Sequence, residues 1–377
     1  MIKILFIHHR LTCGGAEQAL FDLVNLLDKT KFDISVLTLY EGGIWEQKFR
    51  NAGIKLYYDH SCQIKSSNPL VKAQNFVKRC RIRHARKRNG HNLVKHCFPQ
   101  SFDIIVSYLV WNTEEAGFCK GAKSLRYIHG DVNTNPFYHD YIQNSLHLLQ
   151  KYDQFICVSQ NALNSFVSLT KLHNTQLVLN PIDRDRILRL SREKTDLDSG
   201  LPRVCAVGRL TDEKGFERLI RIHKNLLQKG YPHRLLIVGD GPDRDLLRSL
   251  VSQLDVESSV TLAGYSDNPY KYMANSDFLV CSSFTEGLPV VAMEALALGV
   301  PLVSAVPSIG ELFGPEVCGI VCDGSTEELE RSIEKMLADR DFLQQCREGA
   351  QARSSFFDGR NMTKKIESIL IDLSASR

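Results

Sequence analysis

Several features are missing from this sequence, and each absence excludes a class of protein. No segment reaches the about 18 uninterrupted apolar residues that a membrane-spanning helix needs. The eleven cysteines include no Cys-x-x-Cys pair, and the closest two, Cys318 and Cys322, have no matching second pair. Buried reduced thiols in a reducing compartment are therefore expected, and a zinc site is not. Because Met1–His8 favours a strand over a signal peptide, we expect a cytoplasmic globular protein.

Acidic residues are also absent from His60 to Ser101, although the net charge of the whole chain is only +4. Such a stretch suits an anionic membrane surface or nucleic acid, or it is a solvated face of the protein. Its few aromatic residues argue against stacking on single-stranded nucleic acid, so we expect no nucleic-acid partner. A peripheral position on the cytoplasmic face of the inner membrane is the remaining functional interpretation. Most of its lysines and arginines lie between Lys72 and Lys95, namely Lys72, Lys78, Arg79, Arg81, Arg83, Arg86, Lys87, Arg88 and Lys95.

Short apolar segments alternate with helical patterns along the whole chain of 377 residues, which is long enough for two domains. Strands separated by helices indicate parallel βαβ units, so the predicted fold class is α/β with two tandem doubly wound domains. Ligands of such sheets bind at the carboxyl ends of the strands, which predicts a cleft between the domains. The expected strands are Ile2–His8, Asp33–Leu39, Ile54–Tyr58, Asp103–Tyr108, Ser124–His129, Gln154–Ser159, Arg203–Gly208, Arg234–Gly239, Val260–Gly264, Asp277–Cys281, Pro301–Ser304 and Ile320–Cys322.

The break between the two domains is expected at a polar run. Residues 1–183 form the predicted N-terminal domain, and residues 184–201 the linker. Residues 202–357 form the predicted C-terminal domain, and residues 358–377 a last helix that packs back on the N-terminal domain.

The most informative segment runs from Phe284 to Gly299. Pro289 suits the start of a helix, whose free N–H groups and dipole make an anion site. Glu294, the only charge between Pro289 and Gly299, lies about 7.5 Å further along the axis at 1.5 Å per residue. With Glu286 before the helix, this arrangement suits a nucleotide sugar. The alternative is that Glu294 pairs with a buried arginine and Glu286 is a solvated loop residue.

Three other segments carry groups for the same chemistry. Arg209 and Lys214 follow a strand, and their cations suit a diphosphate, although they could be routine charges of a surface loop. His129 ends a strand and could contact a sugar hydroxyl or share developing charge, or it is a structural histidine. Gly15 opens the first helix, where N–H groups could face an anion, or it forms a simple turn. The Val238–Pro242 turn lacks the third glycine of a dinucleotide fingerprint, so we interpret it as structural.

Together these residues resemble the retaining glycosyltransferases of family 4, of the glycosyl transferases group 1 with the GT-B fold. The resemblance is strongest from about Pro202 to Asp323 and weaker before it; one departure is Pro181, where the family usually has glycine. The segments that carry it are Gly208–Gly215, Val238–Pro242, Glu286–Pro301, Gly14–Glu17, His129, Val158–Ser159 and Asn180–Asp183.

The resemblance implies that the N-terminal domain (residues 1–183) binds the acceptor and the C-terminal domain (residues 202–357) binds the nucleotide sugar, and it implies a role for each candidate residue. Arg209 and Lys214 would neutralise the departing diphosphate, assisted by the backbone from Gly287 to Val290 (Gly287, Leu288, Pro289 and Val290). Glu294 would bind the ribose hydroxyls and Glu286 the transferred sugar. His129 would lie near the reacting sugar, and Gly15 near the phosphates or the acceptor.

The implied reaction is transfer with retention of anomeric configuration from a nucleotide sugar, preferably a UDP-sugar, without a metal or other cofactor. The expected acceptor is a saccharide or an undecaprenyl-diphosphate-linked saccharide of polysaccharide or O-antigen-type synthesis. One alternative is a nucleotide-sugar epimerase or hydrolase on the same architecture, with His129, Asp131 and Glu286 as the candidate acid–base groups. Another is a non-catalytic nucleic-acid binder. The sequence does not reveal the oligomeric state.

Overall fold

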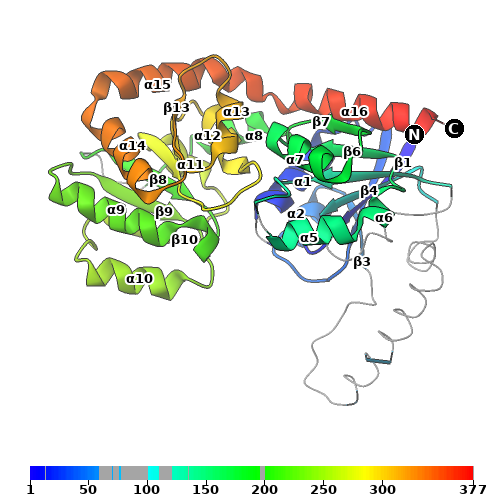
Figure 1. The fold of residues 1–377 in the computed structure, drawn as a ribbon, viewed down its shortest axis with the longest axis horizontal. Helices are drawn as coiled ribbons and strands as arrows, with labels where there is room; N and C mark the ends of the chain where they lie inside the picture. Colours follow the sequence, from blue (N-terminus) through cyan, green and yellow to red (C-terminus); the bar gives the residue numbers. More distant parts are fainter. Residues whose placement is uncertain are drawn as a thin grey trace. The chain divides into compact units, whose positions relative to one another are not determined.

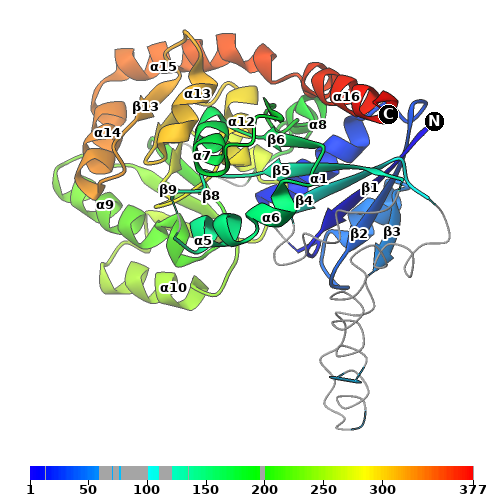
Figure 2. The same ribbon diagram turned by 45° about the vertical axis from the view of Figure 1, so that its right-hand side comes forward.

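The computed structural model describes residues 1–12, 14–58, 70, 76–77, 101–109, 121–134, 136–195 and 200–376. The chain divides into two compact units, one of residues 1–180 with 360–377 and the other of residues 181–359. Each unit contains its own parallel β-sheet with helices packed around it (Figures 1 and 2). Two doubly wound, Rossmann-like domains were predicted, and this prediction is confirmed.

The first unit has a seven-stranded sheet in the order β3-β2-β1-β4-β5-β6-β7 over its described residues, and all neighbouring strands are parallel. The order reverses direction between β1 and β4, which is where ligands of open α/β sheets bind. Its strands are β1 (Ile2–His8), β2 (Phe32–Thr38), β3 (Lys55–Tyr58), β4 (Ile104–Leu109), β5 (Lys123–Ile128), β6 (Gln154–Cys157) and β7 (Thr175–Leu177). Its helices are α1 (Gly15–Leu26), α2 (Glu46–Asn51), α5 (Pro136–Asn144), α6 (Leu146–Leu149), α7 (Gln160–Thr170) and most of α16 (Gly359–Ala375).

The second unit has a six-stranded parallel sheet in the order β10-β9-β8-β11-β12-β13 among the residues that the structure describes, and its order reverses between β8 and β11. Its strands are β8 (Arg203–Val207), β9 (Arg234–Val238), β10 (Val260–Gly264), β11 (Phe278–Cys281), β12 (Leu302–Ser304) and β13 (Gly319–Val321). Its helices are α8 (Arg184–Leu190), η2 (Asp212–Lys214), α9 (Phe216–Gln228), α10 (Arg244–Gln253), α11 (Tyr270–Ala274), α12 (Val290–Ala297), η3 (Pro307–Ile309), α13 (Gly310–Phe313), α14 (Thr326–Ala338), α15 (Arg340–Arg353) and η4 (Ser354–Phe357).

Both sheets are buried on two faces, which explains why their strands are nearly continuous apolar runs. In the second unit one face packs against apolar residues of α9, α10 and α14. Helices α8, α11 and α12 pack together, and α12 also contacts α15. Helix α12 is buried all round except at Val291, so its single charged residue, Glu294, is held inside the unit. The sheet thus fixes both loops that follow β8 and β11 at one edge.

Three segments of the sequence interpretation can be compared with the structure: the predicted linker, the last helix and the basic stretch. Residues 184–201, interpreted as a linker, begin with α8, whose buried Ile187 joins it to the second unit despite its polar composition. Helix α16 belongs to the first unit, where Lys365 Nζ donates to Leu177 O (2.8 Å). The basic stretch Lys72–Lys95 lies outside the described residues except for positions 76 and 77. No helix within the described part is long and apolar enough to cross a membrane.

Candidate active site

The candidate donor site lies at the carboxyl edge of the second sheet, where β8 and β11 are neighbours. The loop of residues 208–215 follows β8, and the loop of residues 282–289 follows β11. This pair of strands is the reversal point of the sheet, the place where open α/β sheets bind ligands. The topology therefore brings together Arg209, Lys214 and Glu286, which are far apart in the sequence.

Lys214 and Glu286 form an ion pair between these two loops. Lys214 Nζ donates to Glu286 Oε1, and the side chains are 23% and 18% exposed. Ser283 Oγ also donates to Glu286 Oε1 (3.0 Å). The cation and the carboxylate are thus held side by side at a partly buried position, where charge interacts more strongly than in water. Both residues were predicted from the sequence as part of the site, but the ion pair between them was not predicted.

The backbones of the two loops are joined closely. Ser282 Oγ donates to Lys214 O (2.8 Å), and the Phe284 amide donates to Glu213 O (2.9 Å). Gly215 has φ +64°, and a Cβ there would lie 2.2 Å from Ser282 O. Only glycine allows both this left-handed backbone and this close approach. The Lys-Gly pair of the sequence is therefore explained by a backbone contact as well as by the lysine charge.

Arg209 is more exposed than Lys214 and pairs within its own loop. Its Nη2 lies 3.4 Å from Glu213 Oε1, and both side chains are more than half exposed. The loop rests on the Val238–Pro242 turn: Leu210 N donates to Asp240 O (3.0 Å), and a Cβ at Gly239 would lie 1.8 Å from Gly208 O. This close contact supports the structural interpretation of that turn.

Helix α12 begins directly after the loop that carries Glu286. Pro289 is its N-cap residue and Val290 its first residue, so the sequence prediction is off by one position. Ser308 Oγ donates to Gly287 O (2.6 Å) and holds the segment before the helix. The first N–H groups of an α-helix have no acceptor within it, so an anion site at this end stays a prediction that the position of the helix start allows.

Glu294 is 6% exposed and lies further along α12. Tyr270 Oη donates to Glu294 Oε1 (2.8 Å), and Arg186 Nη2 lies 3.5 Å from the same tyrosine oxygen. A carboxylate at this depth is costly unless its oxygens are hydrogen-bonded, and Tyr270 supplies one such bond. An arginine, as the alternative interpretation expects, thus lies beside the tyrosine that donates to Glu294.

His129 follows β5 in the first unit. Its Nε2 lies 2.7 Å from Tyr108 O, and because a carbonyl only accepts, Nε2 carries the proton and donates it. Burial, with smaller contributions from the nearby His8 and Arg126, lowers the pKa of His129 to about 4, although the hydrogen bond to Tyr108 O acts in the opposite direction. The ring is therefore neutral at pH 7 with a lone pair on Nδ1. It can accept a hydrogen bond from a hydroxyl group through that atom.

The start of α1, where Gly15 lies, already holds a carboxylate of the same chain. Glu17 is 7% exposed, and its Oε1 accepts a hydrogen bond from Thr12 Oγ1 (2.7 Å). A Cβ at Gly14 would lie 2.8 Å from Glu17 Oε2, so this carboxylate folds back over the first turn. A negative group at this position stabilises the helix dipole. The Gly-Gly-Ala-Glu segment is explained in part by this internal contact.

Sequence reasoning missed three residues that hold the site together: Ser283, Tyr270 and Arg218. Ser283 donates to Glu286 and Tyr270 to Glu294. Arg218, 7% exposed on α9, donates to Ser282 O and Ser283 O. The one signal available for Arg218 was its position four residues after Lys214, which places it on the first turn of a helix whose inner face is otherwise apolar except for His223.

Comparison with known proteins identifies the chemistry of this unit. Residues 189–353 match the family model described as Glycosyl transferases group 1. The chain is 25% identical to the lipopolysaccharide core biosynthesis glycosyltransferase LpsE of Rhizobium meliloti, over 86% of each chain. It is 31% identical, over 48% of its length and 50% of the relative, to a Campylobacter jejuni N-acetylgalactosaminyltransferase whose name gives a diphospho-undecaprenol acceptor.

The fold comparison covers nearly the whole chain. The crystal structure of HepE from Anabaena in complex with UDP has a TM-score of 0.75 and 19% identity, covering 98% of this chain and 100% of HepE. The predicted GT-B fold is confirmed by this likeness. The predicted enzyme class, a glycosyltransferase, is confirmed by the family model and the relatives, although the chain spans only half of the Campylobacter enzyme.

Proposed function

We propose that the chain is a retaining glycosyltransferase of family 4 that moves a sugar from a nucleotide sugar to a saccharide acceptor. The observation that carries this proposal is the Lys214–Glu286 pair at the reversal point of the second sheet, directly before the N-terminus of α12. At this edge the cation and the helix start suit the diphosphate of the donor, and the carboxylate suits its sugar hydroxyls. The family model over residues 189–353 supports the assignment.

Stabilisation of the leaving group is the main chemical task. When the bond between the anomeric carbon and the diphosphate oxygen breaks, its electron pair stays on the diphosphate, which gains negative charge. Lys214 is held at the loop edge to receive this charge, and Arg209 adds a second cation from the same loop. Fixed charges of this kind act where charge develops and need little reorganisation. We propose that these two cations replace a metal ion.

The two carboxylates would contact hydroxyl groups of the donor. Glu286 has one oxygen engaged by Lys214 and Ser283, so the other can accept from the transferred sugar. Glu294 is fixed by Tyr270 and would accept from the ribose hydroxyls. A carboxylate accepts hydrogen bonds strongly, which gives both contacts specificity for hydroxyl groups.

His129 would act as a neutral acceptor near the reacting sugar. Its Nδ1 lone pair suits a hydrogen bond from a sugar hydroxyl, and its low pKa keeps the ring uncharged at neutral pH. Same-face attack by the acceptor hydroxyl on the anomeric carbon would retain the configuration, with the acceptor proton passing to the departing diphosphate oxygen. In this scheme His129 orients the sugar and carries no net charge.

A UDP-sugar is the donor we favour, and a lipid-linked saccharide of polysaccharide or lipopolysaccharide-type synthesis is the acceptor. HepE, which has the same fold, was crystallised with UDP, and the Campylobacter relative is named for a diphospho-undecaprenol acceptor. The basic stretch Lys72–Lys95 would attach the protein to anionic lipid at the cytoplasmic face of the membrane. This last part rests on the sequence alone.

A binding panel followed by a transfer assay tests the proposal. Unfolding temperature would be measured with UDP, GDP, ADP and their sugars, with and without EDTA, because a ligand of the native state raises its stability. A shift with one nucleotide series that persists in EDTA is expected. The stabilising sugar nucleotide would then be supplied with lipid-linked acceptors. Sugar release without any acceptor would point to the hydrolase instead, and no shift with any nucleotide would contradict the donor site.

A further inference from the structure

Arg218 is a buried cation that contacts backbone atoms of the site loops. Its guanidinium uses three nitrogens: Nε donates to Ser282 O (2.8 Å), Nη2 to Ser283 O (3.0 Å) and Nη1 to Gly324 O (2.8 Å). Ser282 and Ser283 follow β11, while Gly324 follows β13. A single side chain from α9 thus joins two loops at the carboxyl edge of the sheet.

The charge of Arg218 is stabilised by backbone carbonyl groups and an aromatic ring. Within the described residues it forms no ion pair with a carboxylate, and backbone carbonyls accept its hydrogen bonds. The ring of Phe284 lies 4.0 Å from its Cζ, which adds a cation–π contact. Burial lowers the pKa of Arg218. A buried cation without a carboxylate partner costs stability, so its forked set of donors must provide something that an apolar residue cannot.

The consequence of this anchoring reaches Glu286. Ser283, whose carbonyl is held by Arg218, donates through its hydroxyl to Glu286 Oε1 (3.0 Å). Ser282, held in the same way, donates to Lys214 O (2.8 Å). Movement of Ser283 would shift the Glu286 carboxylate directly, whereas Ser282 meets Lys214 only at its backbone carbonyl and not at its ammonium group. Arg218 itself lies behind the loop and contacts neither charged side chain in the described structure.

We propose that Arg218 is a positioning residue that sets Glu286 for recognition of the transferred sugar. The inference rests on the proposed function of Glu286 as the sugar contact. Loss of Arg218 should therefore weaken binding of the nucleotide sugar far more than binding of the nucleotide diphosphate, whose ribose contact, Glu294, is held separately by Tyr270. General loosening of the unit would weaken both ligands alike.

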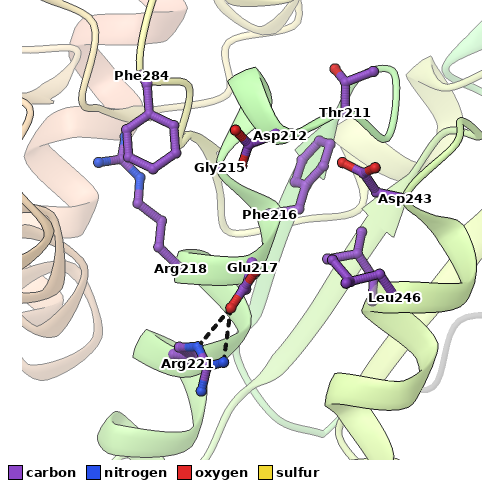
Figure 3. Close-up of a pocket in the computed structure, with 11 residues that line it drawn as sticks. Thr211, Asp212, Gly215, Phe216, Glu217, Arg218, Arg221, Asp243, Leu246 and Phe284 are labelled. Carbon is purple, nitrogen blue, oxygen red and sulfur yellow. Dashed lines mark hydrogen bonds and ion pairs between the residues drawn. The ribbon is translucent and has the colours of Figure 1, made fainter.

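A cavity beside Arg218 makes the inference accessible to chemical rescue. Figure 3 shows Arg218 reaching toward the ring of Phe284, while Arg221, one turn further along α9, pairs with Glu217. The cavity that these residues line has a volume of about 220 Å³. Methylguanidinium in solution can thus reach the position that the side chain leaves in Arg218→Ala. Arg221→Ala is the matched control, because Arg221 is on the same helix and half exposed.

The experiment compares dissociation constants for UDP and UDP-glucose, or for the nucleotide pair that stabilises the wild type, by calorimetry. In Arg218→Ala we expect about 10-fold weaker nucleotide-sugar binding and at most about 2-fold weaker nucleotide binding, in line with the loss of an ordered charged contact. Methylguanidinium at millimolar concentration should restore the ratio, and sodium chloride at equal ionic strength should not. Arg221→Ala should leave both constants unchanged. Arg218→Lys, which keeps the charge but cannot span three carbonyls, should shift the ratio in the same direction.

Three outcomes would each overturn one of the two proposals. An unchanged ratio in both folded variants overturns the positioning role while leaving the proposed function intact. Equal weakening of both ligands, with no rescue by methylguanidinium, identifies Arg218 as a general structural residue and also overturns it. A wild type that binds no nucleotide sugar in the panel contradicts the proposed function itself, and the inference fails with it.

Discussion

The two units treat charge at their strand ends in opposite ways. In the second unit, Lys214 and Arg209 keep their cations at the loop edge and pair with carboxylates of the same unit. In the first unit, His129 is neutral because burial lowers its pKa to about 4, and the start of α1 is covered by the chain's own Glu17. One unit presents cations at its loop edge, and the other presents a neutral histidine and a helix start that its own carboxylate covers.

This difference fits a division of labour in the proposed reaction. A diphosphate leaving group requires cations, whereas a sugar and its acceptor hydroxyl require acceptors that do not compete with phosphate for those cations. The internal contact of Glu17 also means that α1 offers less of an anion site than α12, whose first turn follows Pro289. The comparison predicts that replacing a cation of the second unit affects the diphosphate, whereas replacing the neutral histidine of the first unit affects the sugar.

The largest effect is expected from Lys214→Ala. Loss of a fixed cation at the leaving group should lower kcat by about 10²- to 10³-fold, similar to loss of one oxyanion-hole donor. Arg209→Ala should lower it by only about 10-fold, because Arg209 is more than half exposed and solvent screens its charge. Steady-state kinetics with a fixed acceptor would measure both.

Lys229→Ala is the control for these two variants, because Lys229 pairs with Glu330 and Glu334 on the surface of the same unit. Its kcat should equal that of the wild type. Near-normal turnover of Lys214→Ala would remove the lysine from the leaving-group role and with it the contrast between the units.

The next effect concerns the neutral histidine of the first unit. His129→Gln keeps an amide donor for Tyr108 O but loses the ring Nδ1, so kcat should fall by about 10- to 100-fold while nucleotide binding stays unchanged. The wild-type kcat should not depend on the ionisation of His129 between pH 6 and 8, because its pKa is about 4. Exposed His173 gives the control variant, His173→Gln. Weaker nucleotide binding in His129→Gln would contradict the division of labour.

A smaller effect is expected from Tyr270→Phe in the second unit. The variant removes the hydroxyl that donates to Glu294 at 2.8 Å and leaves the ring in place. Loss of a hydrogen bond to a charged group should weaken nucleotide binding by about 10-fold and change kcat little. Isothermal calorimetry with the nucleotide diphosphate would measure it, with Tyr272→Phe, two residues along α11, as the matched control. An equal loss in both variants would argue for a packing effect.

The fold was predictable because its signals are local. Short apolar runs such as Arg234–Val238 and Val260–Gly264 match the observed strands to within a residue, since strands buried on both faces must be apolar throughout. Helix α8 was missed because it has only seven residues, four of them charged, and Ile187 alone is buried, so its apolar pattern is too short to detect. Polar helices of this kind are held by tertiary contacts that no local pattern records.

The charged residues of the candidate site were predictable from the sequence, whereas the residues that position them were not. Lys214 and Glu286 are recognisable from their loops, but their contact depends on the pairing of β8 with β11, two strands separated by two others in sequence. Arg218 and Tyr270 were missed for a related reason. Their side chains act across the fold on Ser283 and Glu294, so their role exists only once the sheet has formed.

The last prediction concerns a feature that the two units share, a buried neutral histidine. His8 in the first unit and His223 in the second are at most 1% exposed, and burial lowers the pKa of each to about 3. His223 belongs to a hydrogen-bonded chain. His233 Nδ1 donates to Tyr231 O (2.8 Å), so its Nε2 must accept from His223 Nδ1 (2.8 Å). His223 Nε2 then accepts from Ser259 Oγ (2.8 Å), so both rings are neutral in this hydrogen-bonded arrangement.

Because the folded pKa lies below the ordinary value of about 6.5, the unfolded chain binds protons more readily in weak acid. The stabilising contribution of His223 is therefore complete above about pH 6.5 and declines as the pH falls toward 3. At pH 5 the loss from this one group is about 2 kcal/mol, at about 1.4 kcal/mol per pH unit. Unfolding temperatures of the wild type, His223→Gln and His173→Gln at pH 7.5 and 5.0 would measure it. The drop between the two pH values should be smaller in His223→Gln alone. An equal drop in all three proteins would mean that the acid sensitivity arises elsewhere, with His8 of the first unit as the next residue to replace.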